Sequence, residues 1–164
     1  MLDTIVLTLN SNMYTILDKD KFSPSAKVLD NPSHNFGSKG YIKCVQNPSS
    51  IEQKAGNYKP RLSVTKRFVG FGQMDITMKI EFTVPKLLFG NNFDELIDSD
   101  FDKVITKLVT SLKDMGVLVF SKIIMSASVS SIHYSKKHTS HRLHHPAHLY
   151  PPTFQGQLQR HHGF

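Results

Sequence analysis

The feature that most constrains the fold is a run of alternating residues that ends at a proline. In MDITMKIEFTV, residues 74–84, every second position is apolar, and the positions between them carry Asp, Thr, Lys, Glu and Thr. Successive side chains of a strand point to opposite faces, so this run predicts a strand with one face in a core and the other in water. Pro85 has no amide hydrogen to donate to a sheet, so the strand should end there.

A second strand with the same pattern precedes this run. In KPRLSVTKRF, residues 59–68, Leu62 and Val64 alternate with polar residues, and VGFGQ, residues 69–73, supplies a glycine-containing turn. The two runs predict an antiparallel hairpin with one wet face. Residues 18–40 are dense in Pro, Gly, Ser and Asn, which indicates a loop. Further strands are predicted at residues 2–9, 40–46, 116–124 and 127–136.

One amphipathic helix is predicted at about residues 99–115. Ser99 can cap its start, acidic residues follow in the first turn, and Gly116 offers a left-handed stop. Apolar residues recur at steps of three and four, which gives one stripe that must pack on a sheet or another helix. These are Phe101, Val104, Ile105, Leu108, Leu112 and Met115. An antiparallel sheet with one main helix predicts the α+β class.

Composition bounds the class of protein. The chain has 164 residues, enough for one domain, with 20 Lys and Arg against 13 Asp and Glu, and a formal charge of +7. This excess is compatible with a polyanionic partner such as nucleic acid. The single cysteine, Cys44, suits a reducing compartment. No apolar run is long enough to span a membrane, and Asp3 lies where a signal peptide would be basic, so we expect a cytoplasmic protein with no membrane partner.

The candidate DNA-binding residues are basic side chains around the predicted strands. The lysines and arginines within residues 59–67 could hold phosphates, with Tyr58 and Phe68 nearby to stack on unpaired bases. An ordinary solvated sheet face would also explain these charges. A further lysine precedes the turn at residues 90–92, where backbone amides can meet anions, although Gly and Asn there also suit a plain tight turn. The full candidate set is Lys59, Arg61, Lys66, Arg67, Lys86, Lys136 and Lys137.

Two residues of the last predicted strand are candidates for a place beside an active site. His133 could carry a proton or bind a metal, and Tyr134 follows it directly. A histidine in a strand can equally be packed or simply exposed. Residues 1–137 contain only His34 and His133 and no paired-histidine motif, so no metal ligand and no catalytic tyrosine is assigned.

Several stretches together resemble a known family. LDTIVLTL, KPRLSVTKRF, IEFTVPKLLFGNNFDEL, MGVLVF and VSSIHYSK are similar to the N-terminal region of the gene II replication initiators of filamentous phages and of their plasmid relatives. The most specific element is the strand and turn at Val84–Asn92, and the resemblance spans about Leu2 to Lys137. It departs from the family at His133, where a carboxylate is expected.

The resemblance implies a role in rolling-circle DNA replication. Full-length relatives recognise a replication origin, nick one strand through a tyrosine with Mg²⁺ or Mn²⁺, rejoin the ends, and work with host replication proteins; the metal polarises the phosphate. On this reading residues 1–137 are the N-terminal domain, truncated relative to the family, and the chain stops before the nucleophile. We therefore expect a DNA-binding fragment whose own enzymatic activity is left open.

The segment at residues 138–164 admits two interpretations. It holds seven of the nine histidines and no acidic residue, and His141, His144, His145 and His148 have helical spacing that could bind a metal. On that reading the chain is a self-sufficient accessory protein that binds nucleic acid or metal. Yet three prolines interrupt the segment and it has no apolar periodicity. The genetic code allows an acid-containing continuation of the family one base along, so we favour a frameshifted, irregular, non-native tail.

Overall fold

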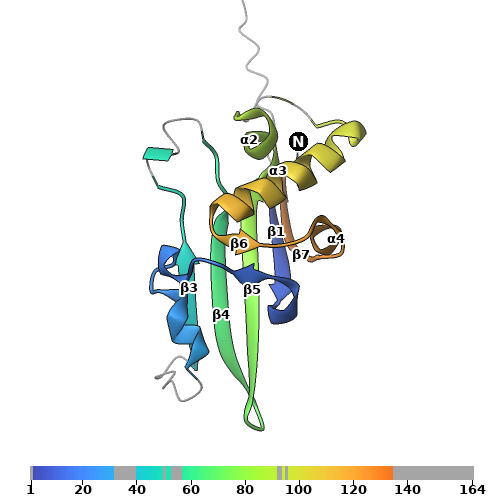
Figure 1. The fold of residues 1–164 in the computed structure, drawn as a ribbon. Coiled ribbons are helices and arrows are strands. Elements are labelled where there is room, and N and C mark those ends of the chain that lie inside the picture. Colours follow the sequence, from blue (N-terminus) through green and yellow to red (C-terminus); the bar gives the residue numbers. More distant parts are fainter. Residues whose placement is uncertain are drawn as a thin grey trace, which may run out of the picture.

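The computed structural model describes residues 2–31, 40–49, 51–52, 57–91, 94 and 96–134. Its centre is a five-stranded sheet in the order β3-β4-β5-β1-β7, and each neighbouring pair is antiparallel (Figure 1). The first and last of these strands along the chain, β1 and β7, therefore lie side by side. The strands are β1 (Leu2–Asn10), β3 (Tyr41–Gln46), β4 (Arg61–Gly70), β5 (Gln73–Thr83) and β7 (Ser128–Tyr134).

Smaller elements form a second layer. The strand β2 (Thr15–Ile16) pairs with β6 (Val117–Leu118), and three short 3-10 helices are η1 (Ser11–Met13), η2 (Lys19–Lys21) and η3 (Ala26–Asp30). The remaining helices are α2 (Val84–Phe89), η5 (Asp98–Asp100), α3 (Phe101–Asp114) and α4 (Ser121–Met125). Figure 1 shows α3 crossing one face of the large sheet, with the β2–β6 pair beside it.

The core lies between this face of the sheet and α3. Leu62 and Val64 of β4, and Met78 and Ile80 of β5, are completely buried in one cluster with Leu108 of α3. Burial of apolar area at this scale is the main favourable term in folding. The apolar stripe of the helix is thus core from Val104 to Met115, as its spacing predicts, whereas Phe101 at its start is 56% exposed and lies outside the core.

The α+β class is confirmed, with an antiparallel sheet and one main helix as predicted. The strands predicted at residues 2–9 and 40–46, the hairpin and its turn, and the strand at 127–136 are each present within a few residues. Strand β5 ends at Thr83, just before Pro85.

Two local predictions are wrong, and one short helix was not predicted. Ser99 does not cap α3: it lies inside η5, where the Asp100 carboxylate accepts a hydrogen bond from the Ile97 amide at 3.3 Å. The segment after the strand, for which no helix was predicted, begins with the short helix α2, since proline fits the first turn of a helix. The strand predicted at residues 116–124 stops after Val117–Leu118, and Ser121–Met125 forms α4 instead.

Candidate nucleic-acid interface

The candidate interface is the second face of the sheet. Along β4, Leu62 and Val64 are buried, whereas Arg61 and Arg67 are exposed and Ser63 and Thr65 are partly accessible. The register pairs these accessible residues with Glu81, Lys79, Thr77 and Asp75 of β5. The burial of these side chains, exposed or intermediate at every position, means that this face is accessible along β4 and β5.

Hydroxyl groups are spread over this open face. The Thr4 and Thr83 hydroxyls lie 3.3 Å apart, and the Thr8 hydroxyl is hydrogen-bonded to that of Ser130 on β7. Hydroxyls can donate to phosphate oxygens without selecting a base. The described hydroxyl residues on the face include Thr4, Thr8, Ser63, Thr65, Thr77, Thr83, Ser128, Ser130 and Ser131.

Positive charge exceeds negative charge on the same face. The register places Lys43, Arg61, Arg67 and Lys79 there, against the carboxylates Glu81 and Asp75 among the described strand residues. The closest pair, Arg61 Nη1 and Glu81 Oε2, is 3.9 Å apart with both side chains about half exposed. Such a pair is weak in water, so the guanidinium can exchange it for a phosphate.

Arg61 and Arg67 lie on this one face, as the period of a strand requires, but Lys66 does not. Its side chain points into the protein and is only 4% exposed. Its ammonium donates to the carbonyls of Leu29 at 2.7 Å and Asn31 at 3.0 Å. The prediction that Lys66 shares a DNA-binding surface with the two arginines is therefore corrected. Its ammonium group is used to hold η3 on the sheet.

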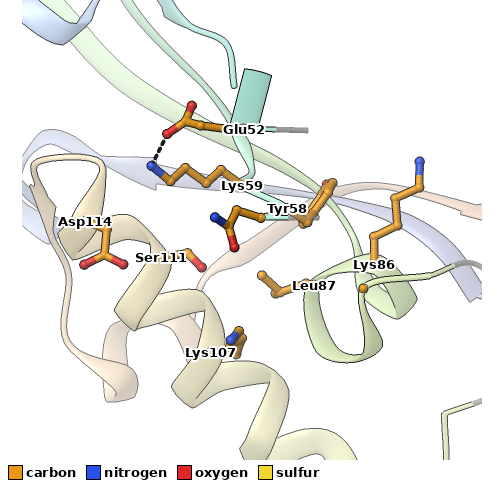
Figure 2. A pocket seen from close by; sticks show the side chains of 10 residues that line it. Glu52, Tyr58, Lys59, Lys86, Leu87, Lys107, Ser111 and Asp114 are labelled. Carbon is orange, nitrogen blue, oxygen red and sulfur yellow. Dashed lines mark hydrogen bonds and ion pairs between the residues drawn. The ribbon is translucent and has the colours of Figure 1, made fainter. Parts of the chain in front are cut away.

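Lys59 and Lys86 lie outside the open face. Both line a cavity of about 500 Å³ between the segment before β4 and the helices α2 and α3 (Figure 2). Lys59 forms an ion pair with Glu52. Hydrogen bonds from Lys59 and from Ser49 lower the pKa of that carboxyl to about 2.

The two aromatic residues expected to stack differ in access. Tyr58 is half-buried, and its hydroxyl accepts a hydrogen bond from the Thr83 amide at 2.6 Å. Burial raises the pKa of this hydroxyl, and the partly buried ring packs against the core. Phe68 is exposed near the end of the hairpin. Phe71, in the turn with a positive φ of 49°, is fully exposed, and the sequence prediction missed it.

The remaining candidates lie at or beyond β7. His133 Nε2 and the Ser131 hydroxyl are 3.0 Å apart on the open face, and Tyr134 is exposed at the end of the strand. Within the described ranges, no three His, Cys, Asp or Glu side chains gather closely enough to hold a metal ion. Lys136, Lys137 and the segment 138–164 lie outside the described residues.

Sequence reasoning also missed Lys43 and Lys79, although a signal for both existed. Lys79 occupies a wet position in the alternating run, and Lys43 alternates with the buried Cys44 in β3. Listing every charge on the predicted wet face would have found them. Lys107, by contrast, joins Lys59 and Lys86 only through the packing of α3.

No helix in the described part of the chain is long and apolar enough to cross a membrane. In comparisons with known proteins, the chain matches no protein-family model, no curated protein and no solved structure.

Proposed function

We propose that this protein binds DNA through the open face of its five-stranded sheet. The observation that carries the proposal is that Arg61 and Arg67 lie on the same face of the sheet. Lys43, Lys79 and several serine and threonine side chains lie on that face with them. Six residues of a strand span about 20 Å, which is a reach of several phosphates. Contacts of this kind provide affinity without base specificity.

The finer proposal rests on the resemblance to phage and plasmid replication initiators. In this role the chain is the DNA-engaging N-terminal part of a rolling-circle initiator in the cytoplasm. Origin DNA is its partner, with host replication proteins joining later. Mg²⁺ or Mn²⁺ would serve the nicking step of the full-length protein.

The test is DNA binding by Arg61→Ala and Arg67→Ala across a salt series, on single-stranded and duplex oligonucleotides. Each substitution should weaken binding and reduce the slope of log K against log salt by about one, because each removes one phosphate contact. Circular dichroism checks that both variants are folded.

Lys122→Ala is the control, because Lys122 is an exposed cation on α4, outside the open face. It should leave both affinity and slope unchanged. If both arginine variants are folded and bind with the wild-type affinity and slope, the open face is not the DNA surface.

A further inference from the structure

Three lysines from separate parts of the chain surround one cavity. Lys59 precedes β4, Lys86 belongs to α2 and Lys107 to α3 (Figure 2). The cavity has a volume of about 500 Å³, within the range of about 300–1,000 Å³ found for sites of small ligands. Its lining also includes Tyr58 and the buried Leu87.

Two of the three ammonium groups have no acidic partner among the described residues. Lys59 is paired with Glu52, whereas no ion pair within the described ranges involves Lys86 or Lys107. The second carboxylate of the lining, Asp114, lies two turns along α3 from Lys107. The lining thus keeps an excess of positive charge around a concave surface.

A buried polar residue faces the same cavity. Ser111 is 7% exposed and lies on the packed side of α3 with Leu108 and Leu112, where the stripe is otherwise apolar. Ser111 is also one of the residues that line the cavity. A serine hydroxyl at the wall of a cavity can donate a hydrogen bond to an oxygen of a bound ligand.

The helices hold these groups in place. Val84, Pro85 and Leu87 of α2 are buried, so Lys86 between them must project outward from a fixed turn. Lys107 and Ser111 are four residues apart on α3 and therefore lie on one side of it. The donors come from rigid elements, which lowers the entropy lost when a ligand binds.

We propose that this cavity is an anion-binding pocket that takes a phosphate group. Ammonium groups and a hydroxyl match phosphate oxygens, and the pocket is large enough for a nucleotide-sized group. The phosphate can come from a free nucleotide or from the end of a DNA strand. The proposal does not depend on DNA binding by the open face.

Pyrophosphate is the first probe, titrated into the full chain and followed by amide chemical shifts in NMR spectra. Signals of residues around Lys86, Lys107 and Ser111 should shift and saturate. Lys86→Met and Lys107→Met should each weaken binding about tenfold or more, because each removes a hydrogen bond to a charged group. Lys122→Met is the control for loss of one exposed charge, and Arg61→Ala should leave pyrophosphate affinity unchanged.

The second arm compares oligonucleotides with a 5′-phosphate and a 5′-hydroxyl. Tighter binding of the phosphorylated strand that disappears in Lys86→Met identifies a strand end as the source. Equal binding of both strands, with pyrophosphate still bound through the lysines, identifies a free phosphate compound. The proposal is overturned if pyrophosphate does not bind, or if it binds equally well to the folded Lys86→Met and Lys107→Met variants.

Discussion

Lys66 is a structural residue at the centre of a basic segment. Replacing it with methionine keeps the length of the stem but leaves the carbonyls of Leu29 and Asn31 without its ammonium. We expect Lys66→Met to lower the free energy of unfolding by about 1–3 kcal/mol, measured by urea denaturation. DNA affinity of the folded variant should not change.

The exposed Lys79 provides the comparison. Lys79→Met should change stability by less than about 0.5 kcal/mol, as surface substitutions usually do, while it weakens DNA binding. The assignment of Lys66 to the interior fails if the two substitutions have the same effects.

Glu52 should remain ionised in unusually acidic solution. Its pKa is lowered to about 2 by hydrogen bonds from Lys59 and Ser49, so the pair contributes to local order above about pH 4.5 and is lost as the pH falls through about 2. A carbon-detected NMR titration of the carboxylate should have its midpoint near pH 2. In Lys59→Met the midpoint should move up toward the ordinary value, and a wild-type midpoint already there would contradict the ion pair.

At the scale of elements, Gly116 forms the turn that connects α3 to β6. Its φ is +81°, and a Cβ added there would lie 2.8 Å from the Cβ of Asp18. Its carbonyl also accepts hydrogen bonds from the amides of Leu17 and Asp18. Gly116→Ala should therefore destabilise the protein by the cost of a left-handed alanine, about 1–2 kcal/mol, plus a further steric cost of about 1–3 kcal/mol.

A comparison with Gly90 separates the conformational cost from the steric cost. It follows α2 with a φ of +76°, and a Cβ added there would meet nothing within 4 Å. Gly90→Ala should show the conformational cost alone in thermal and urea denaturation. Equal losses in the two variants would mean that the contact with Asp18 is unimportant.

The elements that were predicted correctly are those determined by residues close together in the sequence. Alternation in residues 74–84 and the glycine turn before it define the hairpin locally, and the helical stripe defines α3 in the same way. Elements fixed by distant contacts were missed. The two carbonyls that accept hydrogen bonds from Lys66 are 37 and 35 residues away from it in the chain. The helix α4, which takes the place of a predicted strand, buries Ile124 in the core.

The candidate site followed the same rule. That Arg61 and Arg67 lie on the same face could be deduced from the two-residue period of a strand. The lysine cavity could not, since it needs the segment before β4, α2 and α3 to meet. Packing in three dimensions brings these segments together, and no motif in the sequence marks the result.

For the whole molecule, the buried apolar residues all lie between Leu7 and Ile124 among the described residues. Residues 138–164 have no periodic apolar pattern with which to offset an ordering cost of about 1–2 kcal/mol per residue. Deleting them should leave the melting temperature within a few degrees. Deletion from residue 128 onward should lower it strongly, because β1 would lose its pairing with β7. A large loss in the shorter deletion, or zinc binding that raises the melting temperature of the full chain, would favour a genuine metal-binding tail.

The position of β1 between β5 and β7 also has a consequence for biosynthesis. Thr8 and Ser130, hydrogen-bonded across β1 and β7, are 122 residues apart in the chain. At about 5–20 residues per second, a ribosome needs roughly 6–25 seconds between making the first of these strands and the second. Throughout that interval the edge of β1 that later pairs with β7 stays unpaired, and its other edge is unpaired until β5 is made, so a nascent chain of this protein should rely on chaperones until β7 emerges.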